Sequence, residues 1–198
     1  MDRHTNLTLL QRIRDPKDGI AWGEFNYIYG GLLNQWLRRQ GVNGEDCNDI
    51  AQEVLLAVSQ LIQDFQHNGN VGAFRKWLRS VMVYRMRRFI ETRRKRKSKV
   101  SSDYDALVAN LEDDGSRVTE VWNKEHDRHV LLQLLQRVSK QFSEQSLDVF
   151  RRVAIMQEDA ATVAEEMGIK LGALRVAQHR VMKELRNTAA GLVDLESI

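Results

Sequence analysis

The chain has 198 residues, of which 42% are hydrophobic and 29% are charged, and this balance fits a soluble globular protein and argues against global disorder. Its single cysteine, Cys47, excludes an intramolecular disulfide and a multi-cysteine zinc site, and it suits a reducing cytoplasm. The longest uninterrupted apolar run covers residues 54–58, far short of the ~20 residues that cross a bilayer, so we expect a cytoplasmic protein without membrane insertion.

Apolar residues recur every three or four positions along the first half of the chain, which is the helical period. Gly41 is a predicted C-terminal stop for one helix, and Asp46 is the predicted N-cap of the next. Residues 66–70 are polar and no alternating strands flank them, so we expect a loop between two helices. The predicted helices cover residues 9–15, 20–40, 46–62 and 73–97.

Helical periodicity resumes at residue 130, with Ser143 as an N-cap and Gly168 as a break. The predicted helices cover residues 130–138, 145–154, 160–167 and 171–190. No window alternates with period two over the length of a strand, so the predicted fold class is all-α. We expect two small helical domains, residues 1–99 and 128–198, joined by an acidic linker at residues 100–127.

Charge is arranged in blocks along the chain. Residues 75–99 contain twelve basic residues and one acidic residue, whereas residues 98–127 contain eight acidic and three basic residues. A basic run is often only a solvated face, but this density, interleaved with aromatic residues, predicts a polyanion partner. The acidic block is interpreted as a solvated linker between two packed units.

Residues 160–175 have the layout of a helix-turn-helix. Ala164 supplies a small residue where two helices would cross, and Gly168 supplies the sharp turn, where a left-handed backbone costs little. A major groove accepts the outer face of such a second helix. The candidate DNA-binding residues on that face are Lys170, Ala173, Arg175, His179, Arg180 and Lys183. The alternative is an amphipathic hairpin without a DNA role.

Aromatic and basic residues alternate in the predicted helix at 73–97. Cations would bind phosphates without sequence preference, and exposed aromatic rings could stack on unpaired bases. Phe74 and Phe89 are expected in the core, whereas Trp77 is open to either role. The candidate nucleic-acid residues on this helix are Arg75, Lys76, Trp77, Arg79, Ser80, Tyr84 and Arg85.

An acidic and amide strip lies on the helix at 46–62. Asp46, Asp49, Gln52 and Glu53 share helical spacing opposite the apolar stripe. Such a strip is usually a solvated face. On a protein with a basic DNA surface it is also a candidate docking site for a basic protein partner.

Together these residues resemble the extracytoplasmic-function group of the bacterial sigma-70 family. The resemblance depends on a helix-turn-helix at 142–186 and on an arginine-rich helix that follows the last of five motifs. These motifs are Leu9-Leu10-x-x-Ile13, Ala21-Trp22-x-x-Phe25, Trp36-Leu37-Arg38, Asp49-Ile50-x-Gln52-Glu53-Val54 and Phe74-x-x-Trp77-Leu78. The resemblance covers most of the chain except residues 100–127.

The resemblance implies an RNA polymerase sigma factor that directs promoter recognition and DNA melting. Asp49, Gln52 and Glu53 match positions that contact the clamp helices of the largest polymerase subunit. Residues 67–72, together with the candidates on the arginine-rich helix, match the part that melts and reads the promoter −10 element. The candidates at 170–183 match the −35 reader. The implied partners are core polymerase, including the flap of its second-largest subunit, and promoter DNA; an anti-sigma factor is left open.

Two other interpretations compete with this one. A stand-alone helix-turn-helix transcriptional regulator would explain residues 128–198 but leaves the acidic strip and the aromatic, basic helix without a role. An enzyme would need a catalytic or metal site. The only candidate is a pair of histidines, His126 and His129, beside Glu125 and Asp127, and this group lacks a third ligand in register. No nucleophile elbow or phosphate-binding loop is present, so we expect neither enzymatic activity nor a cofactor.

Overall fold

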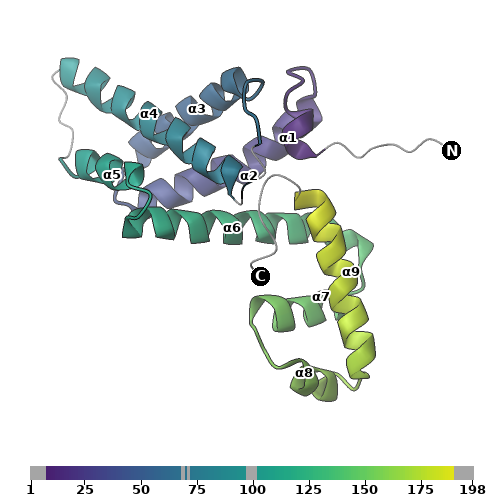
Figure 1. Ribbon diagram of the computed structural model, residues 1–198. Helices are drawn as coiled ribbons and strands as arrows, with labels where there is room; N and C mark the ends of the chain where they lie inside the picture. Colours follow the sequence, from purple (N-terminus) through teal and green to yellow (C-terminus); the bar gives the residue numbers. More distant parts are fainter. Residues whose placement is uncertain (1–7, 68–69, 71, 97–101, 190–198) are drawn as a thin grey trace. The chain divides into compact units, whose positions relative to one another are not determined.

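The computed structural model of the chain describes residues 8–67, 70, 72–96 and 102–189 (Figure 1). Every regular element in these ranges is helical and none is a strand, which confirms the predicted all-α class. The described residues form two compact units, and the boundary between them falls within one helix, after Val130. Residues up to Val130 are called unit 1, and residues from Leu131 onwards are called unit 2.

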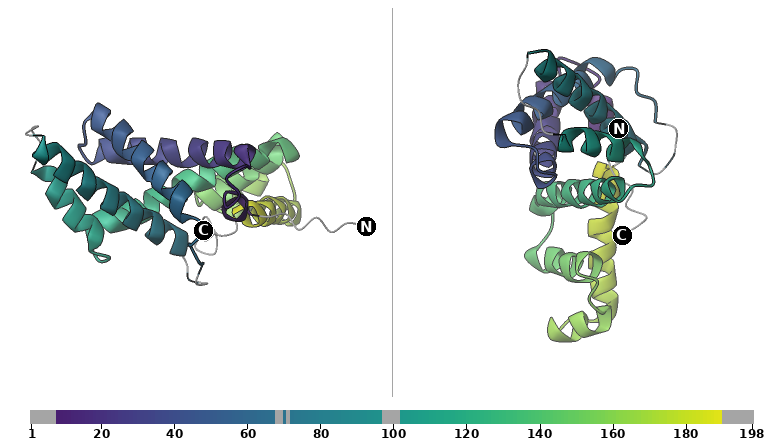
Figure 2. Two further views of the ribbon diagram at one scale, coloured as in Figure 1. Left: turned by 90° about the horizontal axis from the view of Figure 1, so that it is seen from above. Right: turned by 90° about the vertical axis from the view of Figure 1, so that its left-hand side faces the viewer.

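Unit 1 is built on three long helices that pack in sequence order. Helix α2 packs on α3, α3 packs on α4, and α4 packs on α5, as Figures 1 and 2 show. The elements are α1 (Leu9–Arg12), α2 (Gly19–Arg39), α3 (Gly44–Leu61), α4 (Ala73–Lys95), α5 (Asp103–Glu112) and the first part of α6 (Arg117–Val138).

Local signals set the ends of these helices. Gly41 has φ of 82°, and its neighbour Val42 donates a backbone hydrogen bond to the Leu37 carbonyl at 3.1 Å, so the predicted stop of α2 is confirmed. The N-cap of α3 is Asn43 and not Asp46 as predicted. The Asn43 side chain accepts from the backbone N–H of Asp46 at 2.9 Å, which starts the helix earlier.

Aromatic rings from α2, α4 and α6 meet in the core of unit 1. Phe25 stacks on Tyr29 with ring centroids 4.4 Å apart, and Phe74 packs edge-on against Tyr29 at 5.5 Å. Trp36 meets Trp122 edge-on at 5.2 Å, and both indoles are fully buried. The predicted core position of Phe74 is therefore confirmed, and Trp122 brings α6 into the same core.

The prediction of a solvated acidic linker at residues 100–127 is wrong for its described part, residues 102–127. This segment forms α5 and the start of α6, and its apolar residues are buried. On α5 the buried side chains are Tyr104, Leu107, Val108 and Leu111. They follow a helical stripe that the surrounding negative charge obscures in the sequence, and they pack α5 against α4.

Unit 2 is a group of short helices around one longer helix. Val149, Val163, Ala164 and Leu174 form its central cluster. The helix predicted at 145–154 is α-helical only to Phe150 and continues as one π-helical turn. The elements after α6 are η1 (Ser139–Gln141), α7 (Glu144–Phe150), η2 (Arg151–Ile155), α8 (Ala160–Glu166) and α9 (Leu171–Ala189).

Candidate functional site

Helices α8 and α9 and the turn between them form a helix-turn-helix in unit 2. Asp159 caps α8 by accepting from the backbone N–H of Thr162 at 2.9 Å. Gly168 has φ of 64° in the turn, and the N–H of Ile169 donates to the carbonyl of Ala164 at 2.9 Å. Ala164 is buried against the same cluster as Leu174 of α9. The sequence roles of Gly168 and Ala164 are thus confirmed as structural positions.

The outer face of α9 carries all the DNA-binding candidates of unit 2, and each of them is exposed. These residues are Lys170, just before the helix, and Ala173, Arg175, His179, Arg180 and Lys183 on it. The opposite face buries Leu174, Val181 and Leu185, so the helix is held by its apolar side. Within the described part of the chain, none of the four Lys and Arg side chains forms an ion pair. Their charges are open to a polyanion.

Arg152 joins the two ends of α8, a role that sequence reasoning missed. Its Nε donates to Glu158 Oε2 at 2.9 Å, and its Nη2 also donates to Glu166. These carboxylates raise the pKa of Arg152 above its ordinary value. Glu158 precedes α8 and Glu166 ends it, so one guanidinium fixes the turn that leads into the helix-turn-helix. The pairs span six and fourteen residues and leave no signal in helical spacing.

The basic residues at the start of α4 are paired with acidic residues of the segment that follows α4. Arg75 donates to Asp127 of α6, while Lys76 and Arg79 both donate to Asp114 in the turn between α5 and α6. Arg79 is only 5% exposed, although the sequence places it among the DNA-binding candidates. The pKa of the Asp114 carboxyl is lowered by its hydrogen bonds from Lys76 and Arg79.

Pairing continues along the rest of α4. Arg87 donates to Glu112 and Arg94 donates to Asp105, both on α5. On the side towards α3, two further arginines of α4 find acidic partners. Arg85 Nη1 lies 3.5 Å from Glu53 Oε2, and Arg93 Nη2 lies 2.6 Å from Asp46 Oδ1.

The aromatic candidates on α4 differ in burial. Trp77 is half-buried, with its ring centroid 5.0 Å from Phe65 and 5.5 Å from Phe74. Tyr84 is 55% exposed, two turns further along α4. Ser80 is also exposed, and its hydroxyl donates to the carbonyl of Lys76 at 3.0 Å. Trp77 therefore belongs to the core by one face and keeps its other side accessible.

Of the predicted −10 loop at 67–72, residues 68, 69 and 71 lie outside the described residues. Gly72 at its end has φ of 71°, and the guanidinium of Arg75 lies against the position where a Cβ would be, at 2.5 Å. A larger residue at 72 would both strain the backbone and displace Arg75.

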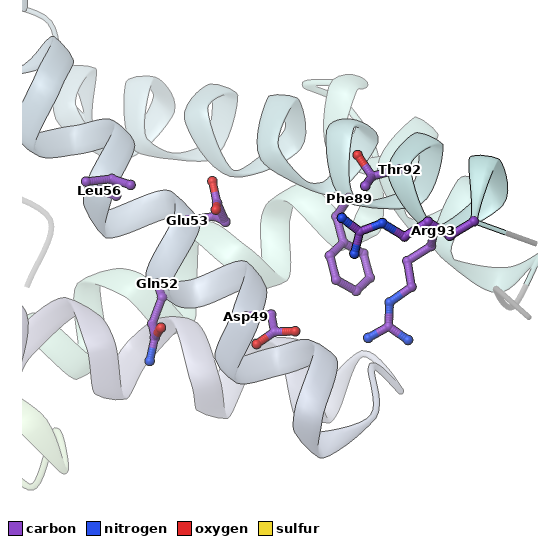
Figure 3. A pocket seen from close by; sticks show the side chains of 8 residues that line it. Asp49, Gln52, Glu53, Leu56, Phe89, Thr92 and Arg93 are labelled. Atoms are coloured by element: carbon purple, nitrogen blue, oxygen red, sulfur yellow. The ribbon is translucent and has the colours of Figure 1, made fainter. Parts of the chain in front are cut away.

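A groove runs between α3 and the C-terminal half of α4, with a volume of about 680 Å³ (Figure 3). Asp49, Gln52 and Glu53 are exposed along its α3 side, as the acidic strip predicts. Leu56 extends this row and is 54% exposed. The α4 side is lined by Phe89, Thr92, Arg93 and Arg96. The groove thus has an acidic wall, a basic wall and an apolar patch.

Asp46 does not belong to the exposed strip, contrary to its predicted place there. It is buried, accepts a hydrogen bond from the Tyr104 hydroxyl at 3.1 Å and pairs with Arg93. Phe89, predicted in the core, is half-buried and lies beneath the guanidinium of Arg93, 4.9 Å from its ring centroid.

His126 and His129 are packing residues of α6. The Nδ1 of fully buried His126 donates to Asp127 Oδ1 at 2.9 Å, and the Nε2 of His129 donates to the Ile28 carbonyl at 2.9 Å. Burial lowers the pKa of both imidazoles from the ordinary 6.5. In the described ranges, no group of three or more His, Cys, Asp or Glu side chains is arranged to hold a metal ion.

None of the helices described is long and apolar enough to cross a membrane. A scan against protein-family models finds no match to this chain, and a search of curated proteins finds no similar sequence.

Proposed function

We propose that this protein is an RNA polymerase sigma factor, a non-enzymatic subunit that binds core polymerase in the cytoplasm and directs it to promoters. The observation that carries the proposal is the helix-turn-helix of unit 2, whose basic outer face forms no ion pair with the described residues. Its polymerase role is supported by the exposed acidic strip of unit 1. The two features perform different steps, recognition of duplex DNA and docking on the enzyme.

Helix α9 is suited to the major groove at the −35 element. Its first turns carry Arg175, whose guanidinium can form two hydrogen bonds to the acceptor edge of a guanine. Lys183 lies two turns further on, where a groove-bound helix approaches the phosphates. Because the apolar face of α9 is fixed in unit 2, the outer face would meet DNA as a preformed surface.

The groove between α3 and α4 is suited to a helix of core polymerase. Asp49 and Glu53 would meet basic residues of the clamp helices, and Leu56 offers an apolar contact at the same edge. A stand-alone helix-turn-helix regulator has no use for such a surface. In this proposal unit 2 also contacts the flap of the second-largest subunit, and an anti-sigma factor would compete for these surfaces.

Helix α4 supplies the DNA-opening surface in the proposal. Tyr84 and the accessible side of Trp77 can stack on unpaired bases, while Lys76 and its basic neighbours bind phosphates. This step acts on DNA that has already been located by α9.

Co-elution with purified core polymerase tests the proposal. The protein should form a stoichiometric complex that survives gel filtration at moderate salt. A protein that binds duplex DNA through unit 2 but never associates with core polymerase would instead be a stand-alone regulator.

A further inference from the structure

The basic face of α4 is already occupied by an acidic ladder from the same chain. The ladder consists of Asp105, Glu112 and Asp114, which follow α4 in the sequence. Arg94 pairs with Asp105, Arg87 with Glu112, and both Lys76 and Arg79 with Asp114. Acidic residues later in the sequence pair with cations earlier on α4, so the two rows run antiparallel.

The paired cations belong to one side of α4. The intervals between these cations are three, eight and seven residues, for positions 76, 79, 87 and 94. Each interval is close to a whole number of helical turns, so the four side chains lie on one face of α4. A phosphate backbone that approached this face would meet the same side chains that the ladder holds. The ladder and a nucleic-acid strand are therefore competitors for one surface.

Apolar packing holds the ladder in place. The buried face of α5, with Tyr104, Leu107 and Leu111, packs against α4 and presents Asp105 and Glu112 to the arginines. The Tyr104 hydroxyl also accepts from the backbone N–H of Asn43 at 3.1 Å, which ties the start of α5 to the start of α3. The acidic row is thus a built part of unit 1.

The cations of α9 are in the opposite state. Arg175, Arg180 and Lys183 are exposed and form no ion pair with any described residue, whereas each of the four α4 cations that face the ladder has a carboxylate partner. Free protein therefore presents the cations of the duplex-reading helix, whereas the cations on one face of the helix proposed for strand opening are paired.

We propose that the acidic ladder is an autoinhibitory mimic of nucleic-acid phosphates that masks α4 until a polyanion displaces it. The inference rests on the proposed function of α4 and adds its regulation. Exposed ion pairs are individually weak, so the mask lowers affinity without abolishing it. Displacement frees Arg79, which is buried beneath Asp114 in the masked state.

A binding experiment with single-stranded DNA tests the mask, because a single strand lacks the major groove that α9 would read. The full-length Glu112→Gln/Asp114→Asn variant should bind a fluorescein-labelled 20-nucleotide strand about three- to tenfold more tightly than wild type at low salt. Its affinity should also fall more steeply with salt, because more free cations then release counterions.

The matched control is Asp113→Asn/Glu120→Gln, which removes two negative charges from the same segment. Neither residue pairs with α4 in the described structure, and Asn at 113 keeps the oxygen that accepts from Gly115 N–H at 2.9 Å. The control should match wild type within about twofold, since only long-range charge changes. Equal gains in the two double variants would overturn the inference.

Two further variants guard against loss of folding and a gain at another site. Glu112→Gln alone leaves buried Arg79 paired and should still bind the strand more tightly than the Asp113→Asn/Glu120→Gln control. Adding Arg87→Gln to the ladder variant should remove part of the gain; an unchanged gain would show that DNA binds elsewhere and would overturn the inference. If no protein in the series binds the strand, the proposed nucleic-acid role of α4 is wrong, whereas binding without a ladder effect contradicts only the mask.

Hydrogen–deuterium exchange supplies an independent readout. Wild-type protein saturated with the strand should exchange faster in peptides from residues 103–116, because displaced acidic side chains loosen α5. Unchanged exchange with DNA bound would show that the strand and the ladder coexist on α4, which overturns the inference.

Discussion

Arg79 lies buried on α4 and donates a hydrogen bond to Asp114, which is 35 residues further along the chain and largely exposed. The arginine lies near the start of the most basic segment, residues 75–99, and its partner lies in the most acidic segment, residues 98–127. This pair explains why the two opposite charge blocks do not behave as separate solvated segments. The acidic block folds back and neutralises part of the basic helix.

The acidic strip on α3 leads to the first prediction. Asp49→Lys/Glu53→Lys should abolish binding to core polymerase, because it reverses the charge of the groove wall proposed to dock on the enzyme. Helicity should be retained, because both side chains are exposed. Loss of the Glu53–Arg85 pair should cost at most about 1 kcal/mol of folding free energy. Asp64→Lys/Glu120→Lys reverses the same charge at exposed positions outside the groove and should bind normally. Undiminished core binding by the Asp49/Glu53 variant would remove the docking role.

Trp77 should act in strand opening. Trp77→Ala should leave the initial promoter complex nearly intact and reduce the number of permanganate-reactive thymines near the start site. Loss of the half-buried ring should also cost about 1–3 kcal/mol of unfolding free energy, less than for a fully buried tryptophan.

Trp77→Phe separates the two roles of this ring. Phenylalanine keeps a ring against Phe65 and Phe74 and a face for base stacking, so opening should largely recover. Should Trp77→Ala open DNA normally and show only a lowered melting temperature, the ring would be purely a core residue.

Base reading and phosphate holding should separate along α9. Arg175→Ala should lose about 1–3 kcal/mol of promoter-binding free energy and relax the sequence preference at one −35 position. The reason is that the Arg175 guanidinium contacts a base edge in our account. Lys183→Ala should weaken all promoters alike and reduce the salt slope by about one. Both variants are measured against a −35 library at two salt concentrations. Equal weakening of every sequence by Arg175→Ala would mean that α9 docks differently.

Stability should fall between pH 7 and pH 5 because of the two α6 histidines. Burial lowers the pKa of His126 and His129 in the folded protein, so the unfolded chain binds protons more readily below about 6.5. Their stabilising contribution is complete above pH 6.5 and is lost as the pH falls, by at most about 1.4 kcal/mol per pH unit for each histidine. The pKa of Asp114 lies below its ordinary value of 3.8, so this carboxyl does not titrate between pH 7 and pH 5.

Chemical denaturation across this pH range tests the assignment. His126→Asn, whose amide can still donate to Asp127, should lower stability at pH 7 but flatten the pH dependence. A variant with the same slope as wild type would place the titrating group elsewhere.

Local features of the structure were predictable from the sequence. The helix-turn-helix depends on signals within twenty residues, such as Gly168 in the turn and Ala164 at the crossing, and both are where the sequence places them. The exposed row of Asp49, Gln52 and Glu53 follows in the same way from helical spacing.

Long-range pairing was not predictable. Partners such as Lys76 and Asp114 are 38 residues apart, so no periodicity connects them. The folding of α5 did leave a signal, because Tyr104, Leu107 and Leu111 repeat every three or four residues. The high charge of the segment outweighed that stripe in the linker interpretation. Burial of Asp46 likewise depends on Tyr104 and Arg93, which come from two other helices.

Run-off transcription with core polymerase tests the central claim most directly. Core enzyme mixed with this protein should initiate at discrete start sites on genomic fragments, and core enzyme alone or with the Asp49→Lys/Glu53→Lys variant should not. Sequences upstream of those start sites should share two conserved elements, one for each DNA-binding surface. If the protein adds no specific start to core polymerase on any fragment, although it is folded and binds DNA, the sigma-factor account is contradicted.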